Sequence, residues 1–244
     1  MKIALFSAFP QELKHIMKNV KLGKSLKRDA SHIFYAQYLA HEIILVQTGM
    51  GIQNAESAFG YVFDSDSADL VLSVGFGGAL YEGAAAGDLV WASRVFLLSE
   101  NSLAVIELQD PMKISLKLPG RTNIFNGSIV TLSSRVKKSD IKKILPQNVS
   151  HPVCDMETYP LAKLSVEKGL PFLAVRSITD TIDEEIPAEF FDVTDGSGRY
   201  RFSRALGILF SKPSLIPQSI KLGRISETAS KNLWLAIQSL IEPR

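Results

Sequence analysis

The stretch 153–181, VCDMETYPLAKLSVEKGLPFLAVRSITDT, constrains the fold of this chain more than any other. Its first half has apolar residues at spacings of three and four, which predicts a helix, and Gly169 followed by Pro171 predicts where that helix ends. Residues 172–175, Phe-Leu-Ala-Val, then have the continuous apolar character of a buried parallel strand, and Asp180 follows it. Open α/β sheets carry their chemistry at the carboxyl ends of such strands. Asp180 is therefore predicted to be a functional acid.

The same alternation of short apolar runs and amphipathic segments extends over the rest of the chain. Strands are predicted at 2–8, 33–39, 42–47, 70–74, 129–132 and from Asp88, and helices from Pro10 and over 52–63 and 139–145. With 244 residues, of which 46% are hydrophobic, the chain is long enough to bury one sizeable core. These features predict an α/β fold in which residues 1–244 form a single domain, with a mixed central β-sheet flanked by helices and a C-terminal helical extension from about residue 202.

Two segments are predicted to be irregular. Residues 99–128 contain turn residues such as Pro111, and the acidic section 183–199 is predicted to be a mobile loop near the functional site. The last helix has an apolar stripe that includes Leu233 and Ile237, which indicates core packing or a subunit contact.

Composition narrows the functional classes. Lys and Arg total 27 against 25 Asp and Glu, so a net charge of +2 gives no general attraction to nucleic acid. Cys154 is the only cysteine, which excludes an intrachain disulfide and fits a reducing compartment. No apolar run of about 18 residues predicts a membrane-spanning helix, and the opening residues do not form a signal peptide. The four histidines lie far apart, without the spacing of metal ligands. We therefore expect a cytoplasmic protein without a metal.

Two glycine-rich turns invite a dinucleotide-binding interpretation. The turn at 75–78 reads GFGG after a predicted strand, and the turn at 49–51 reads GMG. In each, the third glycine of the dinucleotide fingerprint is missing, because Leu80 and Asn54 take its place. We therefore expect no such cofactor, and a dinucleotide-dependent oxidoreductase is disfavoured. The glycines more simply allow the backbone to approach a ligand closely.

Other candidate residues have both a structural and a chemical interpretation. Glu12 and Glu157 fall in the first turns of predicted helices, where the helix dipole favours an acid. Arg176, four residues before the strand-end acid, either steadies carboxylates or is a strand-edge charge. For Cys154 we favour a buried structural thiol over a nucleophile.

Four stretches in the same order resemble the purine nucleoside phosphorylase and uridine phosphorylase superfamily. They are the opening MKIALFSAFPQEL, the turn VQTGMGIQNAESAF, the segment SVGFGGALYEGAAAGDLV, and Met156-Glu157 followed 23 residues later by Thr179-Asp180. The resemblance covers about residues 1–185. Its pattern is most similar to the methylthioadenosine/S-adenosylhomocysteine nucleosidases and to nucleosidase-like proteins of hopanoid biosynthesis.

This resemblance implies a role for each candidate residue. Asp180 would protonate the departing purine, and desolvation at the end of an apolar strand would favour its protonated form. Glu157 would accept hydrogen bonds from the ribose hydroxyls, with Met156 packed beneath the sugar. Gly78 would contact the purine, and Phe76 would line the pocket where relatives often have Ser.

The resemblance also implies the route of the reaction. A glutamate at the position of Glu12 orients and activates the attacking water in nucleosidases of this superfamily. Its phosphorylases have an arginine just before the Gly-rich turn and another in the first loop, whereas this chain has Ser73 at the first place and no arginine before Lys27. Water is therefore the expected nucleophile. Phosphorolysis stays open because some hopanoid-pathway relatives are described as phosphorylases, and so does a nucleoside-binding protein without turnover.

The expected substrate is a purine nucleoside, specifically an adenine nucleoside, acted on by a homodimer. The resemblance implies the dimer, because relatives complete the 5′ side of the pocket with a neighbouring subunit. The apolar segment 202–220 and the pair Phe190-Phe191 suggest a bulky hydrophobic 5′ group, which fits as well as methylthioadenosine. The alternative is that these residues form core or dimer interface.

Overall fold

A computed structural model describes residues 1–99, 102–108, 122–134, 136–184 and 201–242 of the chain. Its elements, in chain order, are β1 (Lys2–Ser7), α1 (Pro10–Asn19), β2 (Lys21–Arg28), β3 (Ser31–Tyr38), β4 (His41–Gln47), α2 (Ile52–Phe63), β5 (Leu70–Ala79), β6 (Leu89–Ser99), β7 (Ser102–Glu107), β8 (Ile124–Leu132), α3 (Lys138–Ile144), β9 (Pro152–Asp155), α4 (Thr158–Glu167), β10 (Phe172–Asp180), α5 (Phe202–Ser211), the 3-10 turn η2 (Pro213–Leu215) and α6 (Ile216–Ile241).

The strands form one mixed sheet, as the alternation of elements predicts. Across it the strands run in the order β10-β6-β8-β9-β5-β1-β4-β3-β2, with β7 paired to β6. Strand β5 also pairs directly with β10, so β5, β10, β6, β8 and β9 pair in a closed ring. Since β1, β5 and β10 are parallel, the three strands end at the same edge of the sheet.

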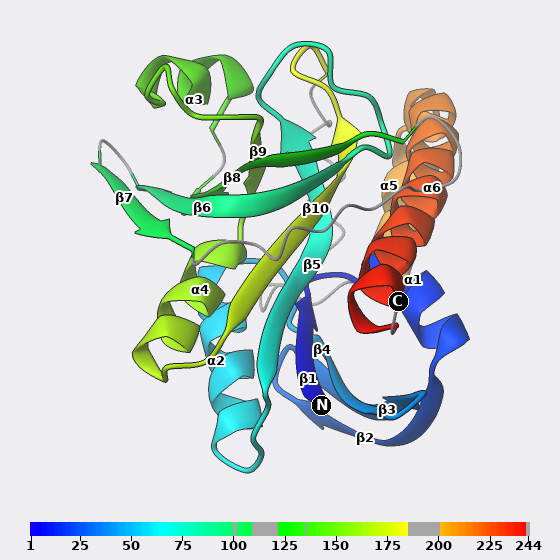
Figure 1. The fold of residues 1–244 in the computed structure, drawn as a ribbon. Helices are drawn as coiled ribbons and strands as arrows, with labels where there is room; N and C mark the ends of the chain where they lie inside the picture. The colour runs from blue at the N-terminus through cyan, green and yellow to red at the C-terminus, as the bar shows by residue number, and fades with distance from the viewer. Residues whose placement is uncertain (100–101, 109–121, 135, 185–200, 243–244) are drawn as a thin grey trace.

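Alternate residues of the central strands supply two separate cores. Ile3 and Leu5 of β1 pack with α1 and α6, whereas Ala4 and Phe6 of the same strand pack with α2 and α4. The period of two in a strand produces this division, because successive side chains point to opposite faces. Figure 1 shows the result, with α2 and α4 on one side of the long strands β5 and β10 and with α1 and α6 on the other.

Most of the predicted elements are confirmed. The hairpin of β3 and β4 is antiparallel, the apolar run after Pro171 is a buried strand parallel to β5, and α2 spans the residues expected of it. Helix α5 begins at Phe202, and α6 follows it to Ile241. The apolar stripe of the last helix is core packing, because Leu233 and Ile237 are buried against the sheet.

The prediction of a turn at residues 75–78 is wrong. These residues continue β5, which runs to Ala79 and pairs with β10 on one side and β9 on the other. Glycine weakens an isolated strand, yet here the neighbouring side chains approach so closely that a β-carbon at Gly77 would lie 2.4 Å from Val153 Cγ1. The absence of side chains is what lets this strand pass between its neighbours.

The irregular segment is also shorter than predicted. Strand β6 runs to Ser99, β7 follows it, and β8 already begins at Ile124. Strand β2, which the sequence analysis did not anticipate, is almost entirely exposed and has the polar sequence KLGKSLKR. Its backbone pairing with β3 makes it a strand, and its charges suit the edge of a sheet. Among the described residues, no helix is long and apolar enough to cross a membrane.

Leu233→Ala should lower the free energy of unfolding by about 2–5 kcal/mol, because Leu233 is fully buried where α6 meets the sheet and its loss leaves a cavity. Ile220→Ala, on the same helix at a position 54% exposed, is the matched control and should change it by about 0.5 kcal/mol at most. Urea denaturation followed by circular dichroism measures both. Equal losses in the two variants would contradict the placement of α6.

Candidate active site

Glu12 lies in the first turn of α1 and is 4% exposed. Its Oε2 accepts hydrogen bonds from Ser7 Oγ at 2.6 Å and from the Phe9 N–H at 2.8 Å, and its Oε1 accepts one from the Phe76 N–H at 2.7 Å. Burial raises the pKa of Glu12 above its ordinary value, although these donors and the positive charge of Arg176 act in the opposite direction. The bond to Phe9 is part of a helix cap, but the bond to β5 is not, so the first-turn interpretation is incomplete.

Glu157 precedes α4 and reaches across to the start of α2. Its Oε1 accepts a hydrogen bond from the Gly51 N–H at 2.7 Å, and Gly51 has a φ of 100°, which favours glycine. Among the described residues no other hydrogen bond to Glu157 is present, so Oε2 is available to a ligand. Burial, and after it the negative charge of Asp155, raises the pKa of Glu157, and Glu12 contributes in the same direction.

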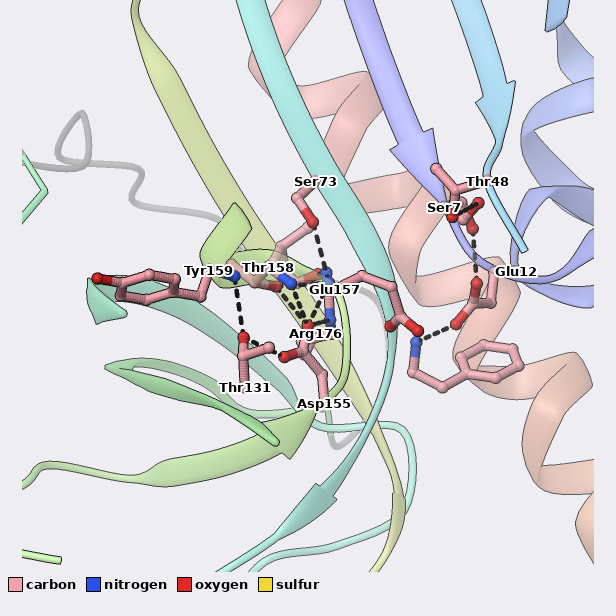
Figure 2. Close-up of polar contacts among 12 residues, drawn as sticks. Ser7, Glu12, Thr48, Ser73, Thr131, Asp155, Glu157, Thr158, Tyr159 and Arg176 are labelled. Atoms are coloured by element: carbon pink, nitrogen blue, oxygen red, sulfur yellow. Dashed lines mark hydrogen bonds and ion pairs between the residues drawn. The ribbon is translucent and has the colours of Figure 1, made fainter. Parts of the chain in front are cut away.

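Arg176 and Asp155 form a buried ion pair close to Glu12 and Glu157. Arg176 donates to Asp155 Oδ2 from Nε at 3.1 Å and from Nη2 at 2.7 Å, and both side chains are almost completely buried. Nη2 also donates to Ser73 Oγ at 2.9 Å and to Thr158 Oγ1 at 2.6 Å. Thr131 Oγ1 donates to Asp155 Oδ1 at 2.7 Å. Figure 2 shows this cluster, with Glu157 lying between it and Glu12. Arg176 therefore steadies a carboxylate, and it is not a strand-edge charge.

The glycines of β5 connect the two ends of the site. A β-carbon at Gly75 would lie 2.8 Å from Glu12 Oε1 and 3.5 Å from Arg176 Cζ, and one at Gly78 would lie 2.6 Å from Asp180 Oδ2. Three residues of strand rise about 10 Å. Glu12 and Asp180 thus both lie against the glycine-rich stretch of β5, Glu12 at Gly75 and Asp180 at Gly78.

Asp180 ends β10 and is buried, as predicted. Its Oδ1 accepts a hydrogen bond from Thr179 Oγ1 at 2.8 Å, and its Oδ2 forms an ion pair with the Lys138 ammonium. The sequence analysis did not identify Lys138. In the structure it is 8% exposed.

The remaining candidates are placed less closely. The Phe76 ring packs against the core cluster of α1 and α6, and only the backbone of Phe76 reaches Glu12. Met156, which precedes Glu157 in the chain, is partly buried. Burial, followed by the negative charge of Asp180, raises the pKa of the Cys154 thiol to about 12, which suits an inert thiol rather than a nucleophile. Phe190-Phe191 and most of the loop 183–199 lie outside the described residues.

Buried carboxyl groups of this kind can perform acid–base chemistry. Glu12 is oriented by three hydrogen bonds, and burial raises its pKa. Asp180 is a second buried acid, and Glu157 has one oxygen without a hydrogen-bond partner among the described residues. Within the described residues, no group of three or more His, Cys, Asp or Glu side chains is arranged to hold a metal ion.

Comparison with known proteins identifies relatives of this chain in sequence and in fold. The sequence profile described as "Phosphorylase superfamily" matches residues 2–206. A 5'-methylthioadenosine/S-adenosylhomocysteine nucleosidase of Exiguobacterium sp. is 24% identical over 78% of this chain and 89% of that relative. An aminodeoxyfutalosine nucleosidase of Campylobacter jejuni is 20% identical over 82% of this chain and 94% of that protein.

Solved structures show the same fold. A 5'-methylthioadenosine/S-adenosylhomocysteine nucleosidase of Colwellia psychrerythraea 34H, in complex with adenine, has a TM-score of 0.72 with 18% identity over 98% of this chain and 94% of that one. The enzyme of the same name from Neisseria meningitidis, in complex with methylthio-immucillin-A, has a TM-score of 0.68 with 15% identity over 98% of both chains. At this identity the likeness establishes the architecture, a mixed sheet flanked by helices.

Asp155→Asn should lower the free energy of unfolding by about 3–5 kcal/mol, because it removes the charge that compensates the buried Arg176 guanidinium. Asp140→Asn removes a carboxylate paired with Lys143 at the surface and should have little effect. Chemical denaturation of both variants checks this, and a loss no greater than that of the control would contradict the ion pair.

Glu157→Gln should weaken the fall of stability with rising pH. Because the pKa of Glu157 is raised on folding, the native protein binds its proton more tightly than the unfolded chain does. This contribution is fully present below the ordinary value of 4.5 and is lost as the pH rises through the folded pKa. The unfolding free energy of the variant relative to the original should therefore increase from pH 5 to pH 8. Parallel curves in urea denaturation would show that Glu157 does not titrate abnormally.

Proposed function

Because this chain belongs to the phosphorylase superfamily, we propose that it breaks the N-glycosidic bond of a purine nucleoside with water, releasing the free base and a sugar. One observation carries the proposal. Glu12 and Asp180 contact β5 only three residues apart, at Gly75 and Gly78, with Glu157 beside them. The relatives that are named as nucleosidases support cleavage of a nucleoside.

Cleavage of this bond builds positive charge on the sugar and negative charge on the departing base. A catalytic site must stabilise both. Asp180 donates a proton to the purine as the bond breaks, and the bonding electron pair goes to the base. Glu157 accepts hydrogen bonds from the ribose hydroxyls through its available oxygen. Glu12 takes a proton from water as the water oxygen bonds to the anomeric carbon.

The hydrogen bonds of Arg176 favour water over phosphate as the nucleophile. Arg176 is the arginine beside Glu12, and its nitrogens are engaged by Asp155, Ser73, Thr158 and the Val175 carbonyl. A guanidinium that is buried and paired in this way is not presented to a phosphate ion.

We propose adenine as the base, since the Colwellia relative binds adenine and the names of other relatives include methylthioadenosine. The 5′ group is either methylthio or a bulky apolar substituent. The bulky substituent was suggested by the apolar segment 202–220. In that segment Ile216 and Ile220 are exposed, at 43% and 54%. We also propose a homodimer in the cytoplasm, for which a mass from light scattering equal to one chain would refute the dimer.

Asp180→Asn should lower the turnover number about 100-fold or more, because an amide does not replace a general acid. Asp183→Asn, an exposed acid three residues further along, is the matched control and should keep its activity. Chromatography of the free base released from methylthioadenosine, adenosine and analogues with long apolar 5′ chains measures both variants, with and without phosphate. Release that requires phosphate would overturn hydrolysis, and unchanged turnover in Asp180→Asn would remove the acid from its role.

A further inference from the structure

We propose that Lys138 is a positioning residue for the reaction: it orients the carboxylate of Asp180 and stabilises the negative charge that Asp180 acquires when it gives its proton to the departing base. This inference rests on the proposed function. It adds a residue on α3, a helix that contributes none of Glu12, Glu157 and Asp180.

Lys138 is the first residue of α3 and lies almost completely inside the protein. Its ammonium pairs with Asp180 Oδ2 and donates to the carbonyls of Thr181 at 2.5 Å and Glu184 at 2.8 Å. The Asp180 carbonyl lies further away, at 3.4 Å. Burying a lysine is costly unless its charge is compensated, so a cation in this place has to be held by these acceptors.

An ammonium group has three N–H donors, and the three nearest acceptors, Asp180 Oδ2 and the carbonyls of Thr181 and Glu184, match them in number. These carbonyls hold the ammonium in place beside Asp180. No donor remains for the base of a nucleoside. Lys138 therefore acts on the reaction through Asp180 and not by touching the substrate.

The surroundings of the carboxylate leave little freedom for another geometry. Asp180 Oδ1 accepts a hydrogen bond from Thr179 of β10. Asp180 Oδ2 lies between Lys138 and the place that a side chain at Gly78 of β5 would occupy. The titratable group facing the pair from β9 is the Cys154 thiol, whose Sγ donates to the Gly78 carbonyl at 3.4 Å. With its pKa raised to about 12, that thiol brings no charge. Lys138 is thus the cation that compensates Asp180 among the described residues.

The proton balance gives Lys138 its effect on rate. The O–H bond of Asp180 breaks as an N–H bond forms on the purine, and the bond between the sugar and the purine breaks with its electron pair moving to the base. The reacting form of Asp180 carries the proton, and the carboxylate paired with the Lys138 ammonium, which the structure shows, is the state reached when that proton has moved to the purine. A charge already in place stabilises this state without reorganisation. Glu12 releases to solvent the proton that it took from the attacking water, and Asp180 takes one from solvent, so both carboxyl groups regain their starting states before the next turnover.

A substrate that needs no acid separates this role from a merely structural one. The leaving group of 4-nitrophenyl riboside departs as a stable anion, so its cleavage does not depend on protonation. Lys138→Met keeps the length of the side chain and removes the ammonium. It should lower the turnover number on the purine nucleoside about 10- to 100-fold, with KM little changed, because small misplacements of a catalytic group have effects of that size. Its activity on the nitrophenyl substrate should stay near that of the original protein.

Lys142→Met is the matched control, since Lys142 lies on the same helix and pairs with Glu82 at the surface. It should leave both activities unchanged. In the Asp180→Asn background, Lys138→Met should cause little further loss on the nucleoside, because the two residues act as one unit. If Lys138→Met does not fold, Lys138→Arg replaces it: this variant keeps the charge but moves it from Oδ2, and it should show a smaller loss with the same selectivity for the purine substrate.

Equal losses on the two substrates, or no loss on either, would overturn the positioning role of Lys138. Additive losses in the double variant would overturn it as well. If Asp180→Asn itself keeps full activity on the nucleoside, the assignment of the acid fails. A loss in Asp180→Asn without one in Lys138→Met refutes only the role of Lys138.

Discussion

The buried pair of Asp155 and Arg176 is the interaction on which the site depends. It connects β9 to β10 and, through Ser73, Thr131 and Thr158, ties these strands to β5, β8 and α4. Glu157 lies two residues after Asp155, and Asp180 lies four residues after Arg176. The ion pair therefore holds in place the two chain segments that carry these candidate catalytic residues. Its charges also reach the acids: Asp155 raises the pKa of Glu157, and Arg176 works against the raised pKa of Glu12.

Much of the fold follows from local pattern. Continuous apolar runs predict buried strands, and the helix before Gly169 and the strand after Pro171 are found where spacing places them. The acids at positions 12, 157 and 180 are recognisable because each stands at the end or start of an element. What local pattern does not contain is the partner across the sheet. Strand β2 has no apolar signal of its own and exists through pairing, and the glycines at 75–78 look like a turn until two neighbouring strands confine them.

The same limit applies to the site. Asp155 stands beside the recognisable Met156-Glu157 pair, yet only the fold brings Arg176 within reach of it. Lys138 belongs to a basic run whose other members are exposed, and nothing in its sequence neighbourhood predicts burial against a residue 42 positions away. Lys138 is the first residue of a short helix, and the acid that it binds is distant in sequence. Only the tertiary structure therefore shows that the two residues pair. Electrostatic partners of catalytic groups are therefore the part of a site that sequence predicts least well.

In the proposed function, water attacks the sugar while the purine leaves, with Glu12 as the base and Asp180 as the acid. The fate of isotopically labelled water tests this claim most directly. With an adenine nucleoside in H₂¹⁸O and phosphate buffer, followed by immediate borohydride reduction and mass spectrometry, we expect one ¹⁸O atom on the anomeric carbon of the sugar product. An unlabelled sugar 1-phosphate as the product would contradict water as the nucleophile.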